Sequence, residues 1–303
     1  LPHKLSQMGP ALAKGDVNRD GLEDVYLGGA SGFAPKLYIQ KSDGSFYLNN
    51  LSYWTNESAY EDIDALFVDI NGDGYQDLYV VSGGNEYPPN DLNYMDRIYI
   101  NDGKGNFSKG SIINTSPFSG SVVKASDYDN DGDMDLFVGA RHVPHQYPLP
   151  ASSILLINQN GTLINRTQTL ASEFENIGMV TDAIWNDYDA DGDPDLTLVG
   201  EWMPITFFNN QNGALKKTEM VGLEDSSGWW FSLEKGDFDG DGDMDFIAGN
   251  LGLNYKYKTS KETPFDIYYN DFDNNGKNDI VLGYYNNNKH YPLRGFSCSS
   301  EQI

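Results

Sequence analysis

The stretch Asp127-Tyr-Asp-Asn-Asp-Gly-Asp-Met-Asp135 places acidic side chains at its first, third, fifth and ninth positions and a glycine at its sixth. Short Asp side chains at alternate positions of a tight loop point towards a common centre, and glycine permits the backbone reversal that closes the loop. The carboxylates would repel one another, and a hard cation that prefers oxygen ligands, usually calcium, removes that repulsion. The stretch matches the start of an EF-hand loop, but Val138 stands at the twelfth position in place of Glu, and Asp135–Gly139 reads as an apolar strand. It therefore predicts a calcium loop between strands.

The same pattern occurs six times in one register. One such loop could equally be a solvated turn, but six copies leave that interpretation little room. We expect up to six calcium ions, with the least support for the last copy, which has the fewest carboxylates. The predicted metal-site positions (one, three, five, seven and nine) are Asp16, Asn18, Asp20, Leu22 and Asp24; Asp69, Asn71, Asp73, Tyr75 and Asp77; Asp127, Asp129, Asp131, Asp133 and Asp135; Asp187, Asp189, Asp191, Asp193 and Asp195; Asp237, Asp239, Asp241, Asp243 and Asp245; and Asp271, Asp273, Asn275, Lys277 and Asp279.

The composition agrees with a metal-binding, strand-rich protein. The 303 residues include 20 Tyr and 15 Phe, which favour strands over helices. The net charge of −25 comes mainly from the Asp loops, and such acidity argues against a nucleic-acid partner, whose phosphates need basic patches. Cys298 is the single cysteine, so no disulfide can form within the chain. No apolar run reaches the length of a membrane span. Repeated calcium loops suit a calcium-rich compartment, and we expect a secreted or cell-surface protein.

The loops mark a repeated unit. The first five loops begin at residues 16, 69, 127, 187 and 237, which gives spacings that suit four short strands. Each of the first four units reads as a strand entering the Asp loop, a strand leaving it, a variable connection and two further strands. Turns such as Asn160-Gly161 and Asn212-Gly213 are strong hairpin signals. A four-stranded antiparallel unit repeated in this way predicts an all-β fold, a β-propeller built from blades.

These residues resemble a known family. Asp-x-Asp/Asn-x-Asp-Gly-x-x-Asp followed by a strand and Gly-Gly or Gly-Ala is similar to the FG-GAP/VCBS repeats, which form the propeller of integrin alpha subunits and of many secreted bacterial proteins. The resemblance covers residues 9–285. A closer likeness, to secreted repeat proteins related to cartilage acidic protein, rests on Gly9-Pro-Ala11 with Gly15–Asn18 and on Gly139-Ala-Arg141-His142 with Pro148-Leu-Pro150. It implies calcium-stabilised blades and a role in binding at the cell surface.

The last part of the repeat departs from the pattern. After the fifth loop comes the polar stretch 250–263, and the sixth loop follows the fifth by only 34 residues. We expect the sixth loop to join the outer strands of the fifth blade; the alternative is that it opens a sixth blade. Residues 1–285 are then about five blades of an incomplete ring, and residues 286–303 begin a further segment. We expect the chain to continue or to be covered by a partner or larger assembly.

Sequence motifs for catalysis are absent: there is no nucleophile elbow, phosphate loop or zinc helix. The connections between second and third strands carry aromatic residues beside charges, as binding faces do, and lie on the face opposite the Asp loops. Packing of Trp202 and Tyr147 between blades is an equally good interpretation. The predicted ligand-binding residues are Glu86, Tyr87, Arg141, His142, Trp202 and Tyr255.

The sequence therefore predicts a calcium-stabilised extracellular propeller that acts as a non-catalytic binding or scaffold module, with a protein or glycan partner at the cell surface. Two alternatives stay open. One is a polysaccharide lyase, for which Arg141, His142 and Tyr147 are the only plausible cluster. The other is a lectin that stacks sugars on aromatic rings such as Trp202.

Overall fold

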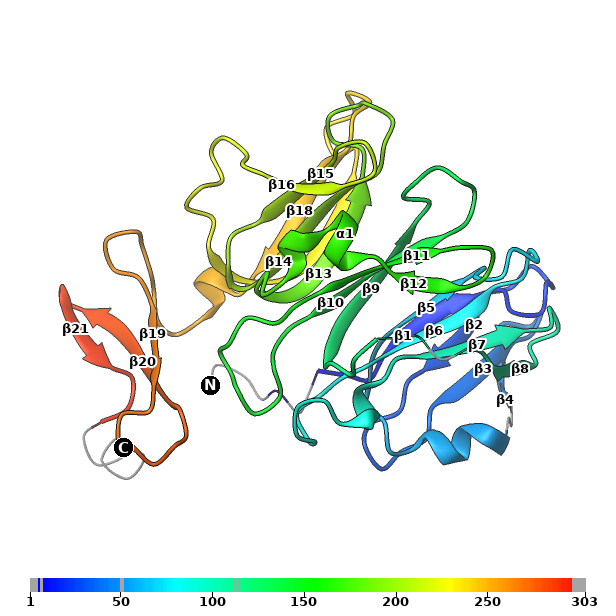
Figure 1. Cartoon of the computed structure of the whole chain (residues 1–303), viewed down its shortest axis with the longest axis horizontal. Coiled ribbons are helices and arrows are strands. Elements are labelled where there is room, and N and C mark those ends of the chain that lie inside the picture. The colour runs from blue at the N-terminus through cyan, green and yellow to red at the C-terminus, as the bar shows by residue number, and fades with distance from the viewer. Residues whose placement is uncertain (1–4, 6–7, 50–51, 112, 114, 296–303) are drawn as a thin grey trace. The chain divides into compact units, whose positions relative to one another are not determined.

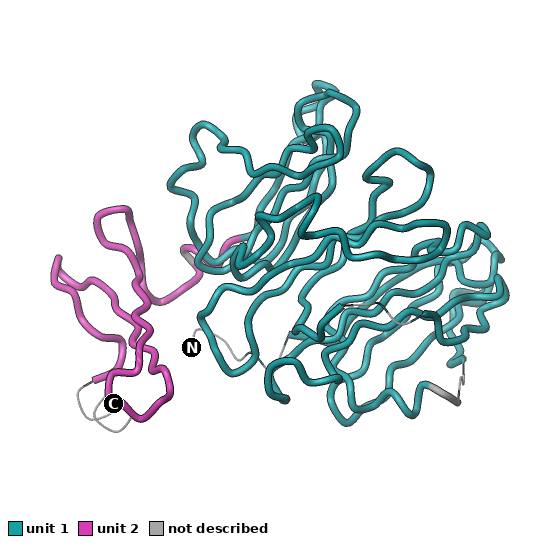
Figure 2. Tube along the Cα trace, viewed as in Figure 1, with its two compact units in different colours: residues 1–249 teal, residues 250–303 magenta. Residues whose placement is uncertain are grey.

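The computed structural model describes residues 5, 8–49, 52–111, 113 and 115–295, which form an all-β structure (Figure 1). The chain divides into two compact units, residues 1–249 and residues 250–303 (Figure 2). Helical segments are short and connect strands. They are α1 (Thr167–Leu170) and the 3-10 turns Ser52–Glu57, Leu92–Tyr94, Ser172–Phe174 and Gly252–Asn254. No helix in the described part of the chain is long and apolar enough to cross a membrane.

The first unit contains four consecutive blade-like sets of four antiparallel strands, each paired in chain order. The first set is β1 (Leu12–Gly15), β2 (Asp24–Leu27), β3 (Lys36–Gln40) and β4 (Phe46–Asn49), and the second is β5 (Asp62–Val68), β6 (Asp77–Ser82), β7 (Arg97–Asn101) and β8 (Phe107–Lys109). The third is β9 (Gly120–Ser126), β10 (Asp135–Ala140), β11 (Ile154–Asn158) and β12 (Leu163–Asn165), and the fourth is β13 (Met179–Asn186), β14 (Asp195–Met203), β15 (Thr206–Asn210) and β16 (Leu215–Thr218). This strand order confirms the predicted blade, with the Asp loop always between first and second strands.

The second strand is rich in apolar residues, and in the second, third and fourth blades both of its faces are covered. In β10, Leu136 and Val138 pack in a cluster with β6, while Phe137 packs in a separate cluster with the fourth blade. All three side chains are completely buried. Full burial of an aliphatic or aromatic side chain contributes about 1.5–3 kcal/mol, so these central strands are the main source of packing energy between blades.

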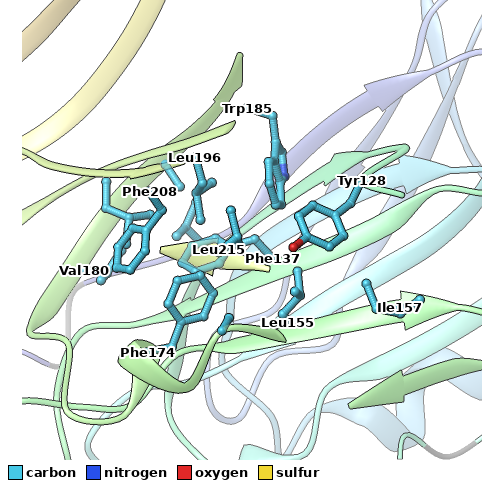
Figure 3. Close-up of a cluster of buried hydrophobic side chains, with 14 of the residues drawn as sticks. Tyr128, Phe137, Leu155, Ile157, Phe174, Val180, Trp185, Leu196, Phe208 and Leu215 are labelled. Carbon is cyan, nitrogen blue, oxygen red and sulfur yellow. The ribbon is translucent and has the colours of Figure 1, made fainter. Parts of the chain in front are cut away.

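Aromatic rings fill the space between the third and fourth blades (Figure 3). The ring of Phe174 lies between those of Phe137 and Phe208, at centroid distances of 5.3 and 5.0 Å and with nearly perpendicular planes. Edge-to-face aromatic pairs of this kind add about 0.5–1.5 kcal/mol beyond the area they bury. Phe174 comes from a 3-10 turn after the fourth strand of the third blade, so this connection is part of the core.

Neighbouring blades are also bridged along their first strands. The N–H of Val123 in β9 donates to the Asp64 carboxylate of β5 at 2.9 Å. The Asp182 carboxylate of β13 accepts the N–H of Leu233, in β17 (Gly228–Gly236), at 2.8 Å. Because the first strands lie side by side in this order, the Asp loops that follow them emerge at the same end of consecutive blades.

The fifth repeat keeps only its first two strands. β17 pairs with β18 (Asp245–Asn250), and its beginning also pairs with the end of β14, opposite Glu201 and Met203. Residues 251–264 contain a 3-10 turn and no strand. The strands of this hairpin are much less buried than their counterparts: Ile247 in β18 is 55% exposed.

The second unit is a three-stranded antiparallel sheet of β19 (Asp266–Asn270), β20 (Asp279–Asn286) and β21 (Lys289–Pro292). The sixth Asp loop joins β19 to β20, as in every other repeat. Because β19 and β20 would flank this loop in either arrangement, both the expectation that it joins the outer strands of the fifth blade and the alternative that it opens a sixth blade stay predictions. β21 pairs with β20, so the boundary placed at residue 285 falls inside this sheet. The number of blades in a complete ring stays a prediction, as does any further segment; residues 296–303 lie outside the described residues.

Candidate functional site

Each Asp loop folds around its first carboxylate. In the third blade, Asp127 accepts the N–H groups of Asp131 and Gly132 at 3.0 and 3.1 Å. The loop can wrap because two of its residues adopt the left-handed conformation. In all six loops the fourth residue has φ between 58° and 79° and the glycine at the sixth has φ between 82° and 100°. Glycine alone adopts that conformation without cost, which explains its place at position six.

The wrapped loop brings carboxylate oxygens together. In four loops the ligand atoms of the first, third and ninth residues lie within 4.8 Å of one another. These four Asp triads are Asp127, Asp129 and Asp135; Asp187, Asp189 and Asp195; Asp237, Asp239 and Asp245; and Asp271, Asp273 and Asp279. A compact all-oxygen donor set fits calcium. The first two loops have Asn18 and Asn71 at the third position and fold in the same way, with Gly21 and Gly74 donating to the first Asp at 2.9 and 2.7 Å.

In the third loop, burial and mutual repulsion make Asp129 and Asp135 hard to ionise without a cation. Burial and, to a smaller extent, the nearby charges of Asp129 and Asp131 raise the pKa of Asp135 to about 6, against two hydrogen bonds from main-chain N–H groups that lower it. Burial and the adjacent Asp131 also raise the pKa of Asp129. A divalent cation among these oxygens would favour the ionised forms, so the electrostatics agree with a metal site.

The structure places the fifth and seventh positions outside the four triads. Asp131 caps the N–H of Asp133 at 2.9 Å. Two of the seventh-position side chains make contacts between loops: Asp193 accepts from the Asn130 amide of the preceding loop at 3.0 Å, and the ring of Tyr75 lies 5.2 Å from Arg19. These side chains therefore hold neighbouring loops together.

The ninth Asp has a second role that the motif alone did not reveal. Its Oδ2 accepts the N–H of the second loop residue in all six loops, as from Tyr128 to Asp135 at 2.9 Å. Its Oδ1 accepts an N–H from the end of the third strand in the first four blades; the donors are Gln40, Asn101, Asn158 and Asn210, at 2.7–2.8 Å. One carboxylate thus ties the loop to the third strand. The Asn that precedes each Asn-Gly or Asp-Gly turn was the available sequence signal.

The predicted ligand-binding residues come from connections opposite the Asp loops, and the structure shows that they differ in exposure and in the unit to which they belong. Glu86 is exposed and Tyr87 half-buried, whereas Arg141 and His142 are 7% and 1% exposed. The expectation that the Arg-His pair projects from the surface is therefore wrong. Arg141 instead forms an ion pair with Glu201, whose side chain is also buried. Tyr255 belongs to the second unit, where its ring contacts those of Tyr257 and Phe265.

Trp202 has an unusual backbone conformation at the blade end opposite the Asp loops. It lies at a register irregularity of β14 and has φ of 59°, a conformation that is rare for a large side chain. Its indole N–H donates to the Tyr147 hydroxyl at 2.6 Å, and its ring stands edge-on to Trp229 at 5.0 Å. Tyr147 is buried while Trp202 stays half-buried, so both interpretations of these rings hold in part: they pack together, and one of them still reaches the surface.

Glu61 is a residue that sequence reasoning missed. Its carboxyl lies beside that of Glu86 near the turn at Gly84. Burial and, after it, the charge and hydrogen bond of Glu86 together raise the pKa of Glu61 to about 7. Burial also lowers the pKa of the nearby His142 to about 4, helped by the charge of Arg141. Both residues are therefore neutral in part or in full near pH 7.

Comparison with protein families decides the classification. A model described as an FG-GAP-like repeat matches residues 16–80, 69–138 and 187–248, each beginning at the first Asp of a loop. The chain belongs to the FG-GAP-like repeat family. The resemblance inferred from the Asp loops is thereby confirmed, and the FG-GAP repeats account for the blades built on the first, second and fourth loops. A search of curated proteins found no match.

Solved structures similar to this FG-GAP chain include an Agrocybe aegerita lectin that recognises non-reducing terminal N-acetylglucosamine, with TM-score 0.43, 14% identity and 94% of this chain aligned. The biofilm matrix protein Bap1 of V. cholerae aligns over 90% of the chain with TM-score 0.42 and 17% identity. The chain spans 66% of the length of the lectin and 37% of Bap1.

Proposed function

We propose that this FG-GAP chain is an extracellular, non-catalytic binding module, stabilised by up to six calcium ions, that contacts a protein or glycan partner at the cell surface. The partner would dock at the blade ends opposite the Asp loops. The observation that carries the proposal is the conformation of Trp202, a half-buried indole held at positive φ by Tyr147 and Trp229.

The argument from Trp202 is energetic. A non-glycine residue in the left-handed region costs of the order of 1–3 kcal/mol, and such strain persists where surrounding contacts hold it, commonly at binding sites. Here the hydrogen bond to Tyr147 and the edge contact with Trp229 hold the ring. A rigid, partly exposed indole supplies large contact area at little cost in conformational entropy, which suits recognition of an apolar protein patch or the face of a sugar ring.

The calcium part of the proposal rests on the Asp loops. The ligand atoms of the four Asp triads are carboxylate oxygens only. The triad members at the first and third loop positions are exposed or half-buried, and the loops that carry them form one end of each blade. Calcium sites with exposed ligands are filled where calcium is abundant, outside the cell. The single cysteine gives the chain no disulfide of its own, so metal ions would take over the role of cross-links between strands.

The proposal that the module is non-catalytic rests on the ionisable side chains near Trp202. A lyase needs a base that can reach its substrate. His142 is buried away from solvent and its lowered pKa makes it a weak base, while Arg141 is engaged by Glu201. Burial raises the pKa of the Tyr147 hydroxyl, which makes it a poor base. These features favour binding over catalysis.

The test is a panel of glycans, polysaccharides and cell-surface extracts, measured for retention and for the absorbance of unsaturated sugar products. Binding should weaken at least about thirtyfold in Trp202→Gly, since glycine accepts the positive φ while the ring is lost. Tyr47→Ala, which removes an exposed ring from β4, is the matched control and should bind normally. Unchanged binding by Trp202→Gly contradicts the binding face, and sustained product formation contradicts the non-catalytic assignment.

A further inference from the structure

The third strands of the second, third and fourth blades end in asparagines that reach into the preceding blade. Their side-chain amides donate to the carbonyl of the second residue of the preceding Asp loop: Asn101 to Val17 at 2.8 Å, Asn158 to Ile70 at 2.8 Å and Asn210 to Tyr128 at 3.1 Å. We refer to Asn101, Asn158 and Asn210 as the bridging asparagines. They are 1–2% exposed, so these bonds are shielded from water.

Every polar group of a bridging asparagine is used. In Asn158, the backbone N–H donates to Asp135 at 2.7 Å, while the side-chain oxygen accepts the N–H of Gly161 at 2.9 Å. Asn101 and Asn210 repeat both bonds, with Asp77 and Gly103 and with Asp195 and Gly213. The oxygen faces a donor and the nitrogen faces an acceptor, so the orientation of the amide follows from its partners.

The bonds join into a relay between metal loops. The N–H of Ile70 donates to Asp77, the ninth residue of the second loop, at 3.1 Å, and the carbonyl of Ile70 accepts from Asn158. The N–H of Asn158 then reaches Asp135, the ninth residue of the third loop. A ligand carboxylate in one loop is therefore connected to that of the next through Ile70 and Asn158. Val17 with Asn101, and Tyr128 with Asn210, extend the same relay over the first four loops.

We propose that the bridging asparagines couple calcium binding in successive blades, so that an ion in one loop raises the calcium affinity of the next. An ion that draws the ninth carboxylate towards it fixes the second loop residue, and with it the carbonyl that positions the asparagine of the following blade. A loop already positioned in this way loses less freedom when it binds its own ion, which is positive coupling between sites. This inference rests on the calcium part of the proposed function and not on Trp202.

The relay also predicts where coupling stops. The described residues provide no bridging asparagine between the fourth and fifth loops: residues 250–264 contain no third strand, and Asp245 accepts only the N–H of Phe238. The fourth and fifth loops are therefore a natural control within the same chain. Coupling is expected between the second and third loops and between the third and fourth, and not between the fourth and fifth.

The test uses calcium alone as the ligand and hydrogen exchange of loop peptides as a site-by-site readout. Asp69→Asn weakens calcium binding by the second loop. The calcium concentration at which residues 127–135 reach half of their maximal protection from exchange should then rise about fivefold or more. In an Asn158→Leu chain the same Asp69→Asn change should leave residues 127–135 unaffected, since the relay is already broken. Gln40→Leu is the matched control: Gln40 takes the same place in the first blade, but among the described residues its side chain bridges to no other Asp loop, and coupling should persist.

A comparison that leaves the asparagines intact covers the case in which Asn158→Leu fails to fold. Asp127→Asn should shift the protection of residues 187–195, whereas Asp187→Asn should leave residues 237–245 unchanged. Equal shifts in both pairs overturn the coupling proposal, as does coupling that survives in a folded Asn158→Leu chain. If calcium protects no loop of the unsubstituted chain from exchange, both the calcium assignment and the coupling proposal are wrong. Protection without any coupling overturns this inference alone.

Discussion

The third and fifth repeats have nearly the same Asp loop but very different surroundings. Asp135 is fully buried and accepts two main-chain N–H groups, one from its own loop and one from the third strand. Asp245 is partly exposed and accepts only the N–H of Phe238. The second strand that follows is completely buried in the third blade and partly exposed in the fifth. The motif thus sets the local fold of the loop, while the third strand and the neighbouring blade set how firmly it is held.

Removal of calcium should have the largest effect, because every loop loses a ligand that binds only the native state. A site filled at a hundred times its Kd contributes about 2.7 kcal/mol, so loss of several sites should lower Tm by more than roughly 10 °C. Calorimetry with and without chelator measures this. Hydrogen exchange sharpens the comparison: residues 237–245 should lose protection at lower chelator concentrations than residues 127–135. An unchanged Tm would exclude calcium as the stabilising ligand.

Deletion of the ninth carboxylate should separate the two repeats directly. Asp135→Ala leaves two buried N–H groups without acceptors, each costing about 1–3 kcal/mol, so we expect a loss of about 3 kcal/mol in the free energy of unfolding. Asp245→Ala removes one partly exposed bond and should cost about 1 kcal/mol or less. Denaturant unfolding in chelator excludes the contribution of the metal. Equal losses for the two variants would mean that the third-strand bond adds nothing.

A smaller effect is expected from pH at the other end of the blades. Burial holds the pKa of His142 at about 4, below its ordinary value of 6.5, so the unfolded chain binds more protons between pH 4 and 6.5. The contribution of His142 to the free energy of unfolding is complete above pH 6.5 and is lost as pH falls towards 4. The loss is about 2 kcal/mol at pH 5. His142→Leu should flatten this part of the stability profile. His290→Leu, at an exposed histidine of the second unit, is the control. Parallel profiles for wild type and His142→Leu would contradict the prediction.

Local chemistry explains why so much of the fold could be predicted. Six loops with carboxylates at fixed spacing and glycine at the sixth position require a particular backbone path, and the apolar runs on either side require strands. The FG-GAP family, the strand order of the first four blades and the Asp loops follow from these rules, although only the first, third and ninth of the five predicted ligand positions come together in the triads. Each loop depends on residues within nine positions of one another, where steric and hydrogen-bonding preferences act directly.

What the tertiary structure alone decided involves groups that are distant in the chain. Arg141 looked like a surface residue until the fold brought Glu201 to it, 60 residues later. No local pattern indicated that the amide of Asn158 reaches Ile70, 88 residues earlier. Such contacts depend on which faces the packing of whole blades brings together. Burial removes water as a competing hydrogen-bond partner, so each buried polar group depends on the particular partner that the fold supplies.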